Sequence, residues 1–225
     1  MEDKVSDMQL SMALGLDPPE VVALVGAGGK TSTLYRLAQE LLAQGRRVIA
    51  TTTTHMWPPP GGSGWPLVIE ETPAARESLT AEAIASQGRA FVAAGLTPEG
   101  RLRGIPPGDV KSLAGLADVL LVEADGARGL WLKAPAAHEP VIPESANLVV
   151  PIVGLQVVGQ PLAENVVHRP EQVAALLRVR TGDIITEDMV ASVLLDPHGG
   201  FKTVPPNARV VPFCNHADTP ERCAA

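Results

Sequence analysis

The sequence predicts an α/β fold with three layers, in which helices cover both faces of a mostly parallel β-sheet. Short apolar runs at 21–25 and 119–122 are typical of strands that are buried on both faces. Segments with the apolar spacing of helices alternate with these runs along the chain. The 225 residues include only 3 Trp, 1 Tyr and 3 Phe, so we expect an aliphatic core, which favours buried parallel strands over an aromatic-rich sandwich.

The composition excludes several classes of protein. Apolar residues make up 45% of the chain, and 18 basic against 25 acidic residues give a net charge of −7. Because nucleic-acid binders need a basic surface, this charge argues against such a partner. No apolar run approaches the roughly 18 residues of a membrane span, and the acidic N-terminus is unlike a signal peptide. We therefore expect a cytoplasmic protein with no membrane or nucleic-acid partner.

The first 55 residues contain one strand–helix–strand unit. A strand over 21–25 runs directly into the sequence Gly-Ala-Gly-Gly-Lys-Thr at 26–31. A second strand over 47–50 ends in four threonines. Between them, apolar residues recur on one helical face up to Gly45, namely Leu34, Leu37, Ala38, Leu41 and Leu42. This order is the βαβ unit of parallel sheets.

The rest of the chain continues this alternation. Further strands are expected at 66–69, 90–94, 118–122, 147–153 and 208–213, and helices at 73–86, 110–116, 170–177 and 187–195. We also expect a short amphipathic segment within 1–19, a turn at 97–103 and a long functional loop at 127–146. A single domain over residues 1–225 is expected. Because a parallel strand normally receives a covering helix, the short remainder after 213 indicates a C-terminal truncation.

The glycine-rich turn after the first strand indicates a phosphate-binding site, because it directs backbone N–H groups and the positive helix end at an anion. A dinucleotide fingerprint needs a third glycine where Thr31 stands, and an acidic residue where the threonines stand. A phosphate loop needs Gly-Lys-Thr at the helix start, and the chain has it in a shortened G-x-x-G-K-T form. The predicted nucleotide-binding residues are Gly26, Ala27, Gly28, Gly29, Lys30, Thr31 and Ser32.

The nucleotide is expected to be ATP or GTP together with Mg²⁺. In this hypothesis Lys30 neutralises the terminal phosphates and the Thr31 hydroxyl ligates the metal. Magnesium also needs an acid on a neighbouring strand, and Glu123 and Asp125 follow the apolar strand at 118–122. Both acids stay candidates for the metal, and Asp125 is, with Lys30, a candidate for a catalytic contact with the terminal phosphate. A structural Asp-Gly turn is the alternative for Asp125.

Eight further polar residues are candidates for contacts with a second substrate. Three follow the second strand, at the same edge of the sheet as the glycine loop. The others lie in the long loop and at the start of the helix at 170, where substrate contacts and anion sites occur. Ordinary strand threonines and a solvated helix cap are the alternatives. The candidates are Thr53, Thr54, His55, Lys133, His138, Glu139, His168 and Arg169.

Asn215 and Asp218 follow the last predicted strand with the spacing of the guanine-reading sequence Asn-Lys-x-Asp. In that sequence the aspartate accepts hydrogen bonds from the base. His216 stands where lysine is usual, and Asn-x-x-Asp also occurs by chance in loops. Base reading by Asn215 and Asp218 and an ordinary loop are both open.

The glycine loop at 25–31, the threonine segment at 51–55 and the acidic segment at 122–127 resemble the YqeC family. Segments 132–140, 164–170 and 215–218 extend the resemblance over nearly the whole chain, and 123–140 is its most diagnostic part. Members of that family are accessory proteins in the maturation of selenium-dependent molybdenum hydroxylases. The resemblance implies a P-loop NTPase-like fold and a molybdenum hydroxylase or its cofactor as a partner, but no particular reaction.

Three functions are compatible with these residues. The first is a Mg²⁺-dependent nucleotide hydrolase or phosphotransferase that serves this maturation. The second is a nucleotide-gated chaperone or binding protein for a cofactor or enzyme partner, in which slow hydrolysis acts as a timer. The third is an ATP-dependent ligase of the Mur type, because those enzymes use a similar short loop, here at 26–32. Such ligases need further domains, for which 225 residues leave little room.

Overall fold

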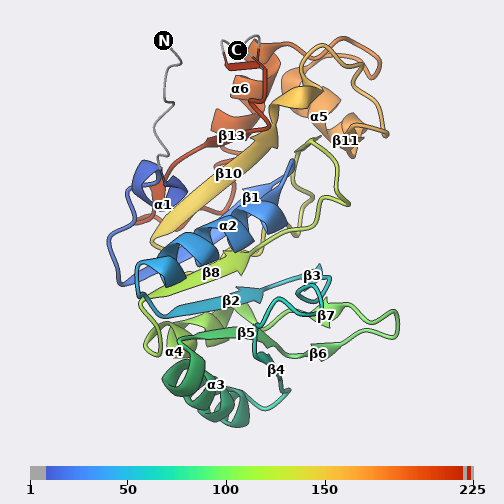
Figure 1. The fold of residues 1–225 in the computed structure, drawn as a ribbon. Coiled ribbons are helices and arrows are strands. Elements are labelled where there is room, and N and C mark those ends of the chain that lie inside the picture. Colours follow the sequence, from blue (N-terminus) through green and yellow to red (C-terminus); the bar gives the residue numbers. More distant parts are fainter. Residues whose placement is uncertain (1–8, 220–221, 224–225) are drawn as a thin grey trace, which may run out of the picture.

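A computed structural model describes residues 9–219 and 222–223 and is built on an eight-stranded central sheet (Figure 1). All pairs in this sheet are parallel, in the order β12-β10-β1-β8-β2-β5-β4, and β13 also pairs with β10. The prediction of a mostly parallel sheet is confirmed. The strands are β1 (Glu20–Gly26), β2 (Val48–Thr52), β4 (Leu67–Ile69), β5 (Arg89–Ala93), β8 (Val119–Glu123), β10 (Leu148–Gly154), β12 (Arg209–Val210) and β13 (Phe213–Asn215).

Helices cover both faces of the sheet because its central strands are apolar on both sides. The face that carries Val22 and Leu24 of β1 packs against the N-terminal helices α1 (Leu10–Ala13) and α2 (Lys30–Ala43). The opposite face, which carries Val21 and Ala23, packs against α3 (Pro73–Gln87) and α4 (Val110–Ala114). Successive residues of β1 therefore point into different layers. This arrangement confirms the predicted three-layer αβα fold.

The carboxyl end of β1 lies in the middle of the sheet, between β8 and β10. Leu24 is level with Glu123 of β8, and Gly26 is level with Ile152 of β10. On the far side of β8, Thr52 of β2 is level with Glu123 as well. Because parallel strands end at the same edge, this topology brings together the glycine loop, the acids after β8 and the threonines after β2.

Two small sheets extend this edge. The first is antiparallel and contains β3 (His55–Met56), β6 (Gly95–Leu96) and β7 (Leu102–Arg103). The second is parallel and contains β9 (Leu132–Lys133) and β11 (Val167–His168). The predicted turn at 97–103 is therefore the tip and second strand of a β6–β7 hairpin, and the predicted loop at 127–146 includes β9. Strands of two residues are too short to produce an alternating pattern in the sequence.

The C-terminal third packs as a separate apolar cluster on the outer part of the sheet. Helices α5 (Pro170–Leu177) and α6 (Glu187–Leu195) contribute Val173, Val190 and Val193 to it, with β9 and β10 on the other side. The predicted strand at 208–213 is interrupted between β12 and β13 at Pro212, which has no N–H group for the ladder.

The short predicted N-terminal amphipathic segment is represented by α1. Its first part, with Met8, lies outside the described residues. Two 3₁₀ turns, Pro107–Asp109 and Leu155–Val157, complete the elements. Among the described residues, every helix is too short or too polar to cross a bilayer.

Candidate functional site

Three glycines shape the loop between β1 and α2. Gly26, Gly28 and Gly29 have φ angles of +89°, +86° and +120°, which L side chains rarely adopt. A Cβ atom on Gly28 would lie 2.1 Å from the backbone nitrogen of Gly154, and one on Gly26 would lie 2.3 Å from the carbonyl oxygen of Ile152. The loop therefore needs glycine both for its conformation and for its close packing against β10.

Most N–H groups of this loop are already used inside the protein. Gly26 donates to Asp125 Oδ2 (3.0 Å), Ala27 to the Ile152 carbonyl (2.9 Å) and Gly28 to the Leu130 carbonyl (2.8 Å). Within the described part of the chain, the N–H groups of residues 29–32 have no acceptor. An anion would therefore bind to the first turn of α2 and not to the loop itself.

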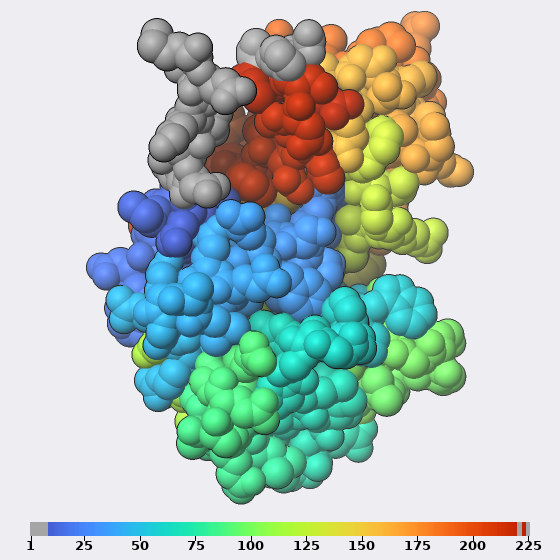
Figure 2. All heavy atoms as spheres, in the orientation of Figure 1, coloured from blue at the N-terminus to red at the C-terminus, as the bar shows by residue number. Residues whose placement is uncertain are grey.

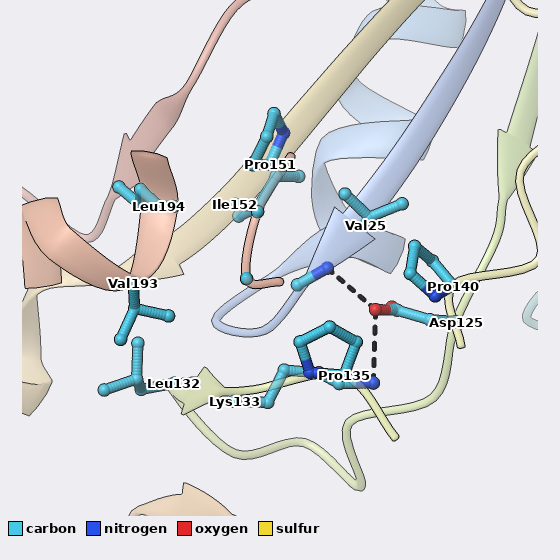
Figure 3. Close-up of a pocket in the computed structure, with 13 residues that line it drawn as sticks. Val25, Asp125, Leu132, Lys133, Pro135, Pro140, Pro151, Ile152, Val193 and Leu194 are labelled. Atoms are coloured by element: carbon cyan, nitrogen blue, oxygen red, sulfur yellow. Dashed lines mark hydrogen bonds and ion pairs between the residues drawn. The ribbon is translucent and has the colours of Figure 1, made fainter. Parts of the chain in front are cut away.

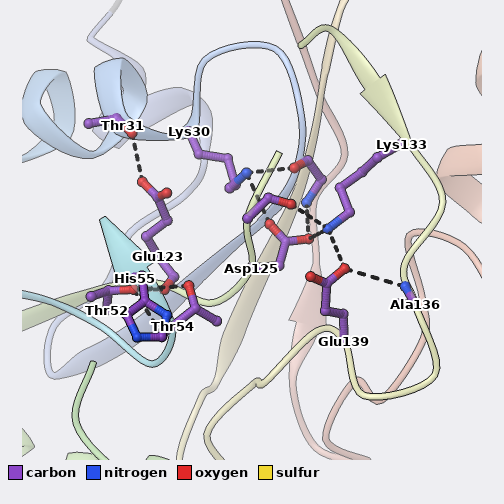
Figure 4. A network of polar contacts seen from close by, with 12 residues as sticks. Lys30, Thr31, Thr52, Thr54, His55, Glu123, Asp125, Lys133, Ala136 and Glu139 are labelled. Atoms are coloured by element: carbon purple, nitrogen blue, oxygen red, sulfur yellow. Dashed lines mark hydrogen bonds and ion pairs between the residues drawn. The ribbon is translucent and has the colours of Figure 1, made fainter. Parts of the chain in front are cut away.

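Lys30 and Asp125 form a buried ion pair directly below the loop (Figure 4). Lys30 Nζ lies 3.0 Å from Asp125 Oδ1 and donates to the Gly26 carbonyl at 2.6 Å. The other oxygen, Asp125 Oδ2, lies 3.1 Å from Lys133 Nζ. Asp125 is only 1% exposed, so this carboxylate is neutralised by two lysines inside the protein.

The network continues from Lys133 to the start of α5. Lys133 Nζ donates to Glu139 Oε2 (2.7 Å), and Arg169 donates to the same carboxylate through Nη1 (2.6 Å) and Nη2 (3.4 Å). Burial alone raises the pKa of Glu139, but the hydrogen bonds from Arg169 and Lys133 hold this pKa at about 2. These contacts fasten the loop after β8 to the helix that begins 30 residues later.

A small cavity lies behind the glycine loop, beside Asp125 (Figure 3). Its volume is about 20 Å³, which is room for one water molecule. Apolar side chains such as Val25, Leu132 and Val193 form most of its wall. The ion pairs of Asp125 are therefore enclosed by the protein core.

The other acid, Glu123, has different surroundings. Glu123 Oε2 accepts a hydrogen bond from Thr31 Oγ1 at 2.8 Å, and the residue is 6% exposed. Burial raises the pKa of Glu123, while the charge of Lys30 and the Thr31 hydrogen bond act in the opposite direction. The carboxylate of Glu123 and the hydroxyl of Thr31 are oxygen ligands of the kind that Mg²⁺ prefers.

The threonines at the end of β2 and directly after it hold this strand end in place. The Thr52 hydroxyl donates to the Glu123 carbonyl (2.8 Å), and the Thr53 hydroxyl donates to the Val141 carbonyl (2.7 Å). Thr54 N–H donates to Thr52 Oγ1 at 3.0 Å. The Thr51 hydroxyl donates to the Val92 carbonyl of β5. Three of the four threonine hydroxyls therefore fasten the end of β2 to β5, to β8 and to the loop at 141.

A cavity of about 1060 Å³ opens at this edge of the sheet. The segment around β3 and the loop after β8 lie on the same side of the molecule (Figure 2) and form parts of its wall. The cavity brings together most of the residues predicted from the sequence. These are Gly28, Gly29, Lys30, Thr31, Ser32, Thr53, Thr54, His55, Glu123, His138, Glu139, His168 and Arg169.

Several predicted residues lie elsewhere. Gly26, Asp125 and Lys133 line only the small inner cavity. Asn215 Nδ2 donates to the Gly28 carbonyl at 2.8 Å and so holds the glycine loop. The side chain of Asp218 is 70% exposed and lies outside the cavity wall. Neither residue of the predicted base-reading pair lines the cavity wall.

His168 and Arg169 enter the wall from β11 and the start of α5. Burial, followed by the charges of Arg169 and Lys133, lowers the pKa of His168. The imidazole is therefore neutral at pH 7. Arg169 has a φ of +61° and is half-buried, with its guanidinium on Glu139.

The sequence analysis missed several polar and aromatic residues of the cavity wall. They share no motif, and they come from segments that read as turns or loops. A φ of +51° at Arg128 marks that residue as unusual, but this signal exists only in the structure. The missed residues include Trp57, Arg101, Arg128, Trp131, Gln156 and His216.

The fold and this site define a class: a three-layer α/β protein with a polar cavity beside a glycine loop, at the carboxyl edge of a parallel sheet. The family model described as YqeC protein matches residues 22–171. The chain is also 36% identical over 228 residues to "Uncharacterized protein YqeC" of Escherichia coli (strain K12), a match that covers 100% of this chain and 87% of that protein. The chain belongs to the YqeC family, which confirms the resemblance found in the sequence.

Proposed function

We propose that the large cavity binds a nucleoside triphosphate with Mg²⁺, and that the protein hydrolyses it or transfers its terminal phosphoryl group. The observation that carries this function is the position of Lys30, Thr31 and Glu123 around the free N–H groups of residues 29–32. A phosphate at this place meets the positive end of α2 and the Lys30 ammonium. A cation bound to that phosphate meets the buried Glu123 carboxylate.

Lys30 is held in position before any ligand binds. Its ammonium contacts the Gly26 carbonyl and Asp125, and its side chain is 4% exposed. Charges that are placed in advance stabilise the charge of a transferring phosphoryl group without the cost of reorganisation. In this function Asp125 positions Lys30, and Asn215 keeps the glycine loop in shape through the Gly28 carbonyl.

The residues at the site fit a magnesium ion. Thr31 Oγ1 and Glu123 Oε2 are neighbouring oxygens, and Mg²⁺ takes only one or two ligands from protein and the rest from phosphate and water. Among the described residues, no group of three or more His, Cys, Asp or Glu side chains is arranged to hold a metal ion. Asp125 already faces two lysines, so we favour Glu123 as the acidic ligand. When bound, the ion would neutralise negative charge on the phosphates.

The part of the cavity away from the glycine loop is proposed to hold a second substrate or partner group. His138, Glu139, His168 and Arg169, which the sequence offers as candidates for substrate contacts, are among the residues that line the cavity. The resemblance to accessory proteins of hydroxylase maturation suggests a selenium or molybdenum cofactor, or a molybdenum hydroxylase itself, as that partner.

Calorimetric titration of the full chain with ATP and with GTP, each with and without Mg²⁺, tests the nucleotide site. Lys30→Ala should weaken binding about 10–100-fold, which corresponds to 1.5–3 kcal/mol for hydrogen bonds to a charged group. Lys111→Ala, which removes an exposed lysine from α4, is the matched control and should bind like the wild type. Phosphate release or transfer is then measured with the nucleotide that binds.

Each alternative gives a different result. Equal binding and turnover by Lys30→Ala and the wild type would falsify the nucleotide site. Binding with negligible turnover, but with partner capture that depends on the nucleotide, would indicate a nucleotide-gated chaperone. An acyl-phosphate formed from a carboxylate substrate would indicate a ligase.

A further inference from the structure

Arg101 lines the large cavity, although it is not among the site residues predicted from the sequence. It lies at the tip of the β6–β7 hairpin, which docks on the segment after β2. Gly104 N–H donates to the Thr54 carbonyl (2.6 Å) and Ile105 N–H donates to the Thr52 carbonyl (2.9 Å). The hairpin is therefore fixed to the strand whose end is level with Glu123.

The side chain of Arg101 is itself held in one position. Its Nη2 donates to the His55 carbonyl at 2.7 Å, and its guanidinium carbon lies 5.9 Å from the ring centre of Trp57. The turn below it is closed by the hydrogen bond from Thr97 N–H to the Arg101 carbonyl (2.8 Å). Arg101 Nε is buried and has no hydrogen-bond partner within the described residues. A fixed guanidinium with an unused donor is suited to an anionic ligand.

Arg101 shares the wall of the large cavity with Lys30, Thr31 and Glu123. Glu123 ends β8, the strand that lies between β1 and β2 in the sheet. Lys30 comes from the β1 side of β8, whereas Arg101 comes from the β2 side. A phosphate bound at Thr31 and Glu123, at the end of β8, would therefore have Lys30 on one side and the Arg101 hairpin on the other.

We propose that Arg101 is a catalytic residue, whose guanidinium contacts the terminal phosphate of the bound nucleotide from the side opposite Lys30. This role rests on the proposed function. In hydrolysis, the oxygen of a water molecule bonds to the terminal phosphorus while the bond from that phosphorus to the bridging oxygen breaks. The electron pair of this bond stays on the leaving diphosphate, and the proton of the water passes to the phosphate products. Arg101 stabilises the charge on the phosphoryl oxygens during this step.

A matched pair of arginines in one hairpin tests this role. Arg101→Ala removes the cavity cation, and Arg103→Ala removes a neighbour that pairs with Glu71 and is absent from the cavity wall. Turnover of MgATP and MgGTP and the affinity for both are measured for the full chain. We expect Arg101→Ala to lower kcat about 100-fold or more with an affinity within about threefold of wild type, since one transition-state donor is worth 10²–10³ in kcat. Arg101→Lys should recover part of kcat, and Arg103→Ala should keep all of it.

Two further measurements make every outcome informative. Thermal unfolding shows whether Arg101→Ala is folded, and if it is not, Arg101→Lys alone is compared with the wild type. If the wild type binds nucleotide without measurable turnover, Arg101 should still be needed for binding of the diphosphate with aluminium fluoride, a mimic of the transferring phosphoryl group. Wild-type kcat and mimic affinity in the Arg101 variants would overturn this role while the nucleotide site stands. No nucleotide binding by the wild type would overturn both.

Discussion

Glu123 and Asp125 stand two residues apart at the end of the same strand, yet their surroundings are opposite. Asp125 lies beneath the glycine loop, with Lys30 and Lys133 on its two oxygens. Glu123 lies beside the first turn of α2, with the Thr31 hydroxyl on one oxygen. Asp125 belongs to an enclosed network of alternating charges, whereas Glu123 lines the large cavity.

The difference shows that the end of one strand can carry both a structural acid and an acid that is available to a ligand. An acid whose charge is balanced by buried cations is costly to remove, because its loss leaves those cations buried without a partner. An acid that is buried with a hydroxyl keeps a charge that the fold does not compensate fully, which is why burial raises its pKa. Removal of each acid should therefore have contrasting effects on stability and on binding.

The largest expected effect is that of Asp125→Asn. The substitution leaves Lys30 and Lys133 buried without their shared anion, so we expect a loss of about 3–5 kcal/mol in the free energy of unfolding. Urea denaturation at pH 7 measures it. Asp118→Asn is the control, because Asp118 pairs with Arg47 at the other, more exposed end of β8, and should cost at most about 1 kcal/mol. Equal effects of the two variants would remove the contrast between enclosed and open charges.

The next effect concerns the glycine loop between β1 and α2. Gly28→Ala forces an L side chain into a φ of +86° and places its Cβ against the Gly154 backbone. A cost of about 2–5 kcal/mol is expected from conformation and overpacking combined. Gly126→Ala has open space around its Cβ and should change stability little. If both variants unfold at the same urea concentration, the result contradicts the inference that the loop packs too closely on β10 to accept a side chain at Gly28.

A smaller effect is expected from pH at the far end of the network. The pKa of Glu139 is about 2 in the folded protein and 4.5 as its ordinary value, so the folded state binds fewer protons between these values. The stability that this group supplies is present above pH 4.5 and is lost as pH falls toward 2, by roughly 2–3 kcal/mol. Urea midpoints of the wild type and of Glu139→Gln should therefore converge over that interval. A difference between the two urea midpoints that stays constant over this interval contradicts this assignment. An equal change in the difference between the wild type and Glu164→Gln contradicts it as well.

The smallest effect on stability is expected from Glu123→Gln. Because burial raises the pKa of Glu123, its charge costs stability above that pKa, and the amide should be neutral or stabilising by less than about 1 kcal/mol at pH 7. The same variant should lose the Mg²⁺ dependence of nucleotide binding in calorimetry. A strongly destabilised variant would place Glu123 with Asp125 as a structural acid.

Much of the site follows from the sequence because its residues lie at the ends of apolar strands. The runs before Gly26, Thr51 and Glu123 predict buried parallel strands, and such strands end at one edge. Arg101 could not be predicted in the same way, because it reaches the cavity through a hairpin of two-residue strands that leave no pattern. Asn215 was predicted from its spacing, but only the fold shows that its amide serves the glycine loop.

The three-layer fold, the family and the position of the glycine loop before α2 can all be derived from the amino-acid sequence. These follow from local patterns: apolar runs, helical spacing and glycines in a fixed order. Only the tertiary structure decided which of the two acids faces two lysines and which faces the cavity. That division depends on Lys133 and Arg169, which are brought to Asp125 and Glu139 by the packing of β9 and α5. Ion pairs of this kind join residues far apart in the chain, so no local pattern encodes them.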